Sequence, residues 1–119
     1  MIYFAGLFLF CVSAAAYAQT AVFVQEKVAI SRSLAGHVEI GITKVPAEDI
    51  TVELCSSDWK TVLTSTKTDA NGHFSLEKPK TGELFYLRLS APGVNPYQLR
   101  VRLKKHGPQE LKIHLSNAT

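Results

Sequence analysis

Apolar and polar residues alternate along most of the C-terminal two-thirds of this chain. Alternation with a period of two puts every second side chain on the same face of a β-strand. The segments with this pattern are 34–43, 50–54, 84–90, 97–103 and 111–115. The side chains expected on the buried faces are Val38, Ile40, Ile42, Ile50, Val52, Leu54, Phe85, Leu87, Leu89, Tyr97, Leu99, Val101, Leu103, Leu111, Ile113 and Leu115. Since no segment keeps the 3.6-residue period of an amphipathic helix, the sequence predicts an all-β protein.

A hairpin is predicted where Asn71-Gly72 follows a threonine-rich run at residues 61–67. Asn-Gly between strands is a strong hairpin signal, and a three-residue loop commonly ends in a residue with positive φ. A three-residue loop also keeps charged residues off the apolar face, so Gly72 is expected at positive φ with a bulge. In this interpretation Asp69, Asn71 and Gly72 form a structural turn. The pairs predicted by this register are Asp69–His73, Thr68–Phe74 and Thr66–Leu76.

Together these segments make about seven short strands, separated by turns at the spacing of roughly 8–12 residues that is typical of β-sandwiches. Each strand has one apolar and one polar face, which favours two sheets packed face to face. The prediction is a seven-stranded antiparallel β-sandwich over residues 34–116, with a small closed barrel as the competing architecture. Residues 19–33 are expected to be an extended lead-in, with an extra edge strand as an option.

Residues 1–18 contain no charged side chain and include a continuous apolar stretch. They end in Ala16-Tyr17-Ala18, a small-residue pattern that signal peptidases cleave. We therefore expect a secretory signal peptide, with an uncleaved membrane anchor as the alternative. A lipid anchor at Cys11 is disfavoured because bulky residues precede it. The protein is then expected to be exported, to the periplasm, the envelope or the medium, with no membrane span after cleavage.

Several short motifs, read together, resemble those of carboxypeptidase regulatory-like domains. The matching segments are Gly36-x-Val38, Ile50-x-Val52-x-Leu54, the stretch from Thr68 to Leu76, Ser90-Ala91-Pro92-Gly93 and Leu111-x-Ile113-x-Leu115. The resemblance implies a transthyretin-like, Ig-like sandwich of seven strands. It also implies an accessory domain without catalytic residues, here in a small exported bacterial protein.

Asp69 and Asn71 also resemble part of a calcium-binding loop, in which oxygen ligands precede a glycine. An EF-hand loop needs three such ligands before its glycine and a glutamate near its end. Only two precede Gly72, and Glu77 comes too early. The structural turn is therefore the preferred interpretation of these residues.

Other residues with reactive side chains give no recognisable site. The four histidines would bind a metal only if the fold brought them together, because none is paired at a ligand spacing. Cys55 has no assignable base and is interpreted as a structural thiol, with intermolecular pairing as the alternative. Trp59 is expected in the core or at a sheet edge. The sequence therefore predicts no cofactor, metal or catalytic residue. The histidines are His37, His73, His106 and His114.

The chain is mildly basic, with 13 Lys and Arg against 10 Asp and Glu and a net charge of +3. Arg100, Arg102 and Lys104 share the polar face of one predicted strand, and Lys112 could extend this face. Such a row could attract an anionic envelope polymer, although a solvated face that discourages aggregation is the preferred interpretation. Nucleic acid is disfavoured because the protein is expected to be exported and the row has no interleaved aromatic residues.

These observations favour a non-enzymatic binding or structural module that acts through its sheet faces or edges. A peptide binder that adds a strand to an edge of its own sheet is an alternative. A transthyretin-like hydrolase is disfavoured because the chain ends in His114-Leu115-Ser116-Asn117-Ala118-Thr119, unlike the C-terminus of those enzymes. The sequence predicts no particular partner protein and no oligomeric state.

Overall fold

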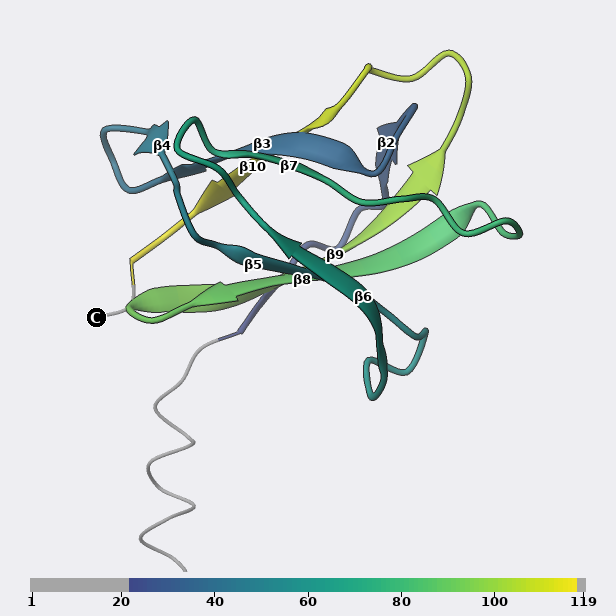
Figure 1. Ribbon diagram of the computed structural model, residues 1–119, viewed down its shortest axis with the longest axis horizontal. Coiled ribbons are helices and arrows are strands. Elements are labelled where there is room, and N and C mark those ends of the chain that lie inside the picture. Colours follow the sequence, from purple (N-terminus) through teal and green to yellow (C-terminus); the bar gives the residue numbers. More distant parts are fainter. Residues whose placement is uncertain (1–21, 118–119) are drawn as a thin grey trace, which may run out of the picture.

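The computed structural model describes residues 22–117, where the chain forms ten β-strands and no helix (Figure 1). The strands are β1 (Phe23–Val24), β2 (Ala29–Ser31), β3 (Ala35–Ile40), β4 (Val45–Pro46), β5 (Thr51–Cys55), β6 (Val62–Lys67), β7 (His73–Ser75), β8 (Leu84–Ala91), β9 (Val94–Leu103) and β10 (Leu111–Leu115). The predicted all-β fold is confirmed. The segment expected to be a signal peptide, residues 1–18, lies outside the described range. Within that range there is no helix of the length and hydrophobicity needed to cross a membrane.

The larger sheet has six strands in the order β1-β9-β8-β5-β6, and β2 pairs with β9 beyond the end of β1. The four strands from β9 to β6 are antiparallel neighbours. The lead-in runs parallel to β9, with Phe23 beside Tyr97 and Ala29 beside Val101. In the part that the structure describes, the lead-in therefore supplies two short edge strands.

The smaller sheet has four strands, and β3 lies at its centre. On one side β3 pairs in parallel with β10, and on the other it pairs antiparallel with β4 and β7 in succession. The expectation of seven antiparallel strands therefore needs correction, because ten strands form two mixed sheets in the described range. Alternation specifies which residues form a strand, but it does not specify the direction of the strand that pairs with it.

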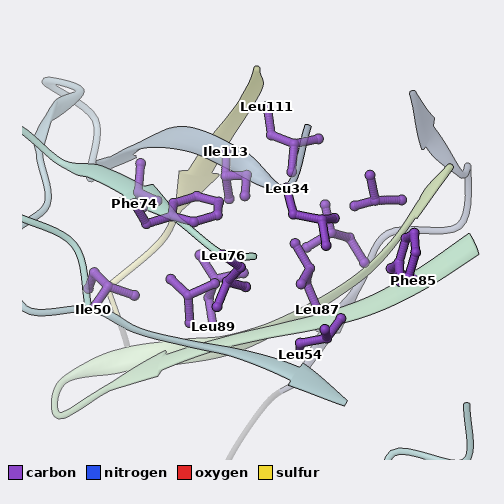
Figure 2. Close-up of a cluster of buried hydrophobic side chains, with 14 of the residues drawn as sticks. Leu34, Ile50, Leu54, Phe74, Leu76, Phe85, Leu87, Leu89, Leu111 and Ile113 are labelled. Carbon is purple, nitrogen blue, oxygen red and sulfur yellow. The ribbon is translucent and has the colours of Figure 1, made fainter. Parts of the chain in front are cut away.

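The core lies between the two sheets, whose apolar faces meet as in a sandwich. Figure 2 shows Leu111 and Ile113 from the smaller sheet pointing toward Leu87 and Leu89 from the larger one. Leu87 and Leu89 are fully buried, and burial of such a side chain stabilises the fold by roughly 1.5–3 kcal/mol. The buried apolar residues are Leu34, Val38, Ala47, Ile50, Val52, Leu54, Phe74, Leu76, Phe85, Leu87, Leu89, Leu99, Val101, Leu111, Ile113 and Leu115.

All the side chains expected to face inward are in this core or pack against it, except Ile42. The prediction that Ile42 faces inward was wrong, because this residue is 99% exposed. The strand ends at Ile40 because Gly41 turns the chain at a φ of 80°, and Lys44 donates its N–H to the Gly41 carbonyl oxygen at 3.2 Å. The turn at Gly41 therefore ends the strand, although the alternation of apolar and polar residues in the sequence continues to Ile42.

The predicted hairpin at residues 69–72 is a corner between the sheets. Gly72 has a φ of 81°, as expected, and the Asp69 N–H donates to the His73 carbonyl oxygen at 2.9 Å. Beyond this contact the predicted register was wrong: β6 pairs with β5, whereas β7 pairs with β3 and places Phe74 opposite Gly36. The loop therefore transfers the chain from the larger sheet to the smaller one.

Candidate functional site

The turn at residues 69–72 is held by hydrogen bonds within the protein. The Asp69 carboxylate accepts the backbone N–H groups of His73 at 3.0 Å and Asn71 at 2.9 Å, which lower the pKa of Asp69. The Gly72 carbonyl oxygen accepts the Val38 N–H at 2.8 Å, and this bond ties the turn to β3. Both bonds end on the same carboxylate oxygen, Oδ1, and they hold the loop in its turn conformation.

Thr68 connects this turn to the segment between β4 and β5. Its hydroxyl donates to the Ala47 carbonyl oxygen at 2.6 Å and accepts the Ile50 N–H at 2.9 Å. The Thr68 side chain is buried, with 3% of the residue exposed. These bonds satisfy two buried backbone groups at the point where the chain leaves β6.

The basic residues that the sequence placed on one face are divided among three places. Arg100 and Arg102 do point outward from β9, opposite Tyr86 and Leu84. Arg100 donates to the Glu26 carbonyl oxygen at 2.6 Å, and Arg102 forms an ion pair with Glu83 at 2.9 Å. Both guanidinium groups therefore already have partners in the lead-in and in the β7–β8 connection.

Lys104 and Lys112 are separated from that pair. Lys104 follows β9 and lies in a hollow at the end of the larger sheet, together with Arg32, Lys78 and Lys105. Lys112 is exposed on β10, where it lies beside His37 on the outer face of the smaller sheet. The expectation that Lys112 would extend the Arg100 face was wrong, because the core separates the two outer faces.

The fold brings two of the four histidines together. His37 on β3 lies opposite His73 on β7, with ring centroids 4.9 Å apart, and the His37 Nδ1 is 3.9 Å from a Glu39 carboxylate oxygen. His114 lies on the exposed side of β10. Among residues 22–117, no three His, Cys, Asp or Glu side chains are gathered closely enough to hold a metal ion.

Cys55 and Trp59 belong to the outer side of the larger sheet. Burial raises the pKa of the Cys55 thiol, which keeps it protonated and poorly nucleophilic at neutral pH. Trp59 contacts Tyr86 edge to face, with ring centroids 5.5 Å apart. Arg88 bonds the Glu53 carboxylate at 2.8 Å and the Trp59 carbonyl oxygen at 3.2 Å, so it holds the β5–β6 turn against the sheet.

The feature with the clearest binding potential is the edge of the larger sheet at β6. This strand ends the order β1-β9-β8-β5-β6, so within the described residues one of its sides has no paired strand. Five of its six residues are exposed, among them Val62 at 42% and Leu63 at 58%. Figure 1 shows β6 in front of β8, with the β5–β6 loop projecting beyond the sheet.

The hydrogen-bond pattern shows which backbone groups face the open side. The Thr68 N–H donates to the Ile50 carbonyl oxygen at 3.0 Å, which fixes the phase of the antiparallel ladder between β5 and β6. Bonding and non-bonding pairs alternate in such a ladder. Thr66 and Thr64 therefore bond to β5, whereas the N–H and C=O groups of Ser65 and Lys67 point toward the open edge.

The other strands at the sheet borders are shorter. β1, β2, β4 and β7 have two or three residues each, and Pro46 in β4 lacks an N–H to donate. β10 has five residues, and the chain at both of its ends is tied to the larger sheet: Arg32 N–H to Pro108 O at 2.8 Å, and Asn95 N–H to Ser116 O at 3.2 Å. Short strands and proline are devices by which proteins block edge pairing, and β6 has neither.

Only indirect signals of the β6 edge and of the basic hollow are present in the sequence. The run at 61–67 lacks a buried apolar face, which is typical of an edge strand, but its position in the sheet depends on the order of all the strands. Arg32 and Lys78 are isolated in sequence from Lys104, so no local pattern could have grouped them.

No known protein-family model matches the chain, and no curated protein matches its sequence.

Proposed function

We propose that the protein is a non-catalytic binding module that pairs an extended segment of a partner protein with strand β6. The open, exposed edge of β6 is the observation that carries this proposal. Pairing of backbone groups along a sheet edge supplies affinity, and contacts with alternate side chains supply specificity. Ser65 and Lys67 would each contribute one N–H and one C=O to the new ladder.

The side chains of β6 suggest the chemistry of the partner segment. Val62 and Leu63 expose apolar surface that apolar residues of an added strand would cover. Lys67 would favour an acidic residue opposite it, because opposite charges on paired strands attract. The partner is therefore an extended segment with apolar residues at one end and an acidic residue at the other.

The wider context of the protein is part of the same proposal. The β-sandwich-like all-β fold supports a domain of the carboxypeptidase regulatory-like, transthyretin-like type, which serves as an accessory to other proteins. The apolar N-terminal sequence supports export to the envelope or the medium. A binding role at a sheet edge suits such an accessory domain, since it requires no catalytic group.

The test uses the full chain and random linear peptides displayed on phage. Peptides selected on the wild-type protein would be synthesised, and their dissociation constants measured against Ser65→Pro and Ser65→Ala. Proline removes the outward N–H of Ser65 and adds a bulky ring at the edge, while the β5 bonds of Thr64 and Thr66 remain. We expect Ser65→Pro to weaken binding at least tenfold and Ser65→Ala, which keeps the N–H, to bind within about twofold of wild type.

Hydrogen exchange provides a second readout at the same residues. The Ser65 and Lys67 amides are expected to exchange rapidly in the free protein and slowly with the peptide bound. Failure to select any peptide, or equal affinity for Ser65→Pro and wild type, would overturn the proposal. A dimer that Ser65→Pro dissociates, without peptide binding, would show instead that a second copy of this chain pairs with β6.

A further inference from the structure

The hollow beyond the end of β9 concentrates positive charge. It has a volume of about 560 Å³ and is lined by Arg32, Lys78, Lys104 and Lys105, with Glu83 as its one acidic residue. Figure 1 shows that the β7–β8 connection and the end of β9 lie at the same end of the molecule. Three chain segments that are distant in sequence therefore bring four cationic side chains to one place.

Backbone hydrogen bonds fix the segments that carry these side chains. Arg32 donates its N–H to the Pro108 carbonyl oxygen at 2.8 Å, and Lys104 donates to the Ser31 carbonyl oxygen at 3.0 Å. The Leu103 N–H donates to the Glu83 carbonyl oxygen at 2.9 Å and joins β9 to the β7–β8 connection. The backbone around the hollow is therefore largely organised before any ligand arrives, which lowers the cost of binding.

The one carboxylate at the hollow does not neutralise its cations. Glu83 pairs with Arg102, at 2.9 Å, on the neighbouring part of β9. Among residues 22–117, the ion pairs are His37–Glu39, Arg88–Glu53 and Arg102–Glu83, and none includes a cation of the hollow. Four like charges held close together repel one another, so an anion that enters between them is stabilised by all four.

We propose that this hollow binds a ligand with two or more neighbouring phosphate groups. A single phosphate carries too little charge to balance four cations, whereas a diphosphate matches them more closely. Lysine and arginine bind phosphate through their positive charge, and arginine can form paired bonds to two of its oxygens. The volume is within the range of roughly 300–1,000 Å³ of sites for small molecules, and so exceeds the needs of one phosphate.

This site is independent of the one proposed for peptides. Two strands, β8 and β5, separate β9 from β6 in the larger sheet. The Ser65→Pro variant should therefore bind phosphate ligands as the wild type does. If the protein binds no peptide, only the proposal for β6 is overturned. If it binds no phosphate ligand, only the proposal for the hollow is overturned.

The experiment titrates the full chain with orthophosphate, pyrophosphate and tripolyphosphate by calorimetry at low ionic strength. We expect saturable binding that is at least tenfold tighter for pyrophosphate than for orthophosphate and that weakens as salt is added. The double substitution Lys104→Gln/Lys105→Gln should weaken pyrophosphate binding at least tenfold. The single substitution Lys78→Gln, in a different loop, should weaken it about threefold.

The matched control is Lys60→Gln/Lys112→Gln, which removes the same net charge from exposed positions outside the hollow. It should bind pyrophosphate within about twofold of wild type. Equal weakening by the two double variants would show that net charge alone attracts the anion, and this would overturn the site. Equal affinity for orthophosphate and pyrophosphate would overturn the proposed ligand class.

Vesicles distinguish the source of the phosphates. One sample contains vesicles with a lipid that carries two phosphates, and the other contains vesicles made only of lipids whose headgroups have no net charge. Binding to the diphosphorylated vesicles that is lost in Lys104→Gln/Lys105→Gln would identify a lipid headgroup as the source. Binding of free pyrophosphate without vesicle binding would identify a soluble ligand, and binding of neither would overturn the proposal.

Discussion

The buried hydroxyl of Thr68 is expected to contribute more to stability than its size suggests. The substitution Thr68→Val keeps the shape of the side chain but removes the bonds to the Ile50 N–H and the Ala47 carbonyl oxygen, at 2.9 and 2.6 Å. Ala47 and Ile50 are 4% and 3% exposed, so water cannot replace the lost partner without a rearrangement. Two backbone groups would then be left buried and unpaired.

The magnitude follows from the cost of those two groups. An unpaired buried donor or acceptor costs about 1–3 kcal/mol. The methyl group that replaces the hydroxyl returns up to about 0.8 kcal/mol of hydrophobic stabilisation. We therefore expect Thr68→Val to lower the free energy of unfolding by about 1–5 kcal/mol. A domain of this size has about 5–15 kcal/mol in total, so the loss would be large.

Urea denaturation followed by tryptophan fluorescence measures this change, because Trp59 packs against Tyr86 on the larger sheet and so reports when that sheet unfolds. Thr68→Ser keeps the hydroxyl and loses a methyl group, so it should cost about 1 kcal/mol. Thr64→Val on exposed β6 should change stability by less than about 0.5 kcal/mol. If Thr68→Val were as stable as Thr68→Ser or more stable, the hydroxyl would not be holding the corner as described.

Three further changes test other parts of the structure. Gly72→Ala should destabilise the protein by at least about 2 kcal/mol in urea denaturation. The alanine Cβ would lie 2.5 Å from the Val38 carbonyl oxygen, and the residue would have to keep a positive φ. An unchanged denaturation midpoint would contradict this geometry. Hydrogen bonds lower the folded-state pKa of Asp69, so the carboxylate's contribution to the free energy of unfolding is complete above the unfolded pKa of about 3.9 and is lost as pH falls through the folded value. Asp69→Asn should therefore be less stable than wild type at pH 7, and the two proteins should become equally stable in acid. A stability difference that stays constant with pH would refute this. The Cys55 thiol, buried and with a raised pKa, should react with iodoacetamide at least about tenfold more slowly in native protein than in urea, and equal rates would show that it is accessible.

The alternation of apolar and polar residues was enough to place the main strands and the faces that they bury. Leu87, Leu89, Leu99 and Val101 alternate with polar residues, and their two-residue period places them in the core whatever strands lie beside them. The positive φ of Gly72 was equally local, since it follows from the conformation that the Asn71-Gly72 turn requires.

The pairing of the strands, by contrast, depends on contacts between segments that are distant in sequence. The threonine-rich run at 61–67 and the segment that follows Gly72 were predicted to be the two halves of a hairpin, but the chain crosses between sheets and Phe74 pairs with Gly36 instead. That choice depends on which apolar faces can be buried together, and a local pattern contains no information about this. Ile42 was misplaced for a related reason, because the alternation continued past the residue where Gly41 turns the backbone.

The two proposed sites also depend on the assembled fold. The open edge at β6 exists because the order of strands ends there, and strand order is a property of the whole sheet. The hollow exists because Arg32, Lys78 and Lys104 come from connections that meet at the end of β9. Charge and exposure can be read along a sequence, but the grouping of residues into a surface requires the distances that folding sets.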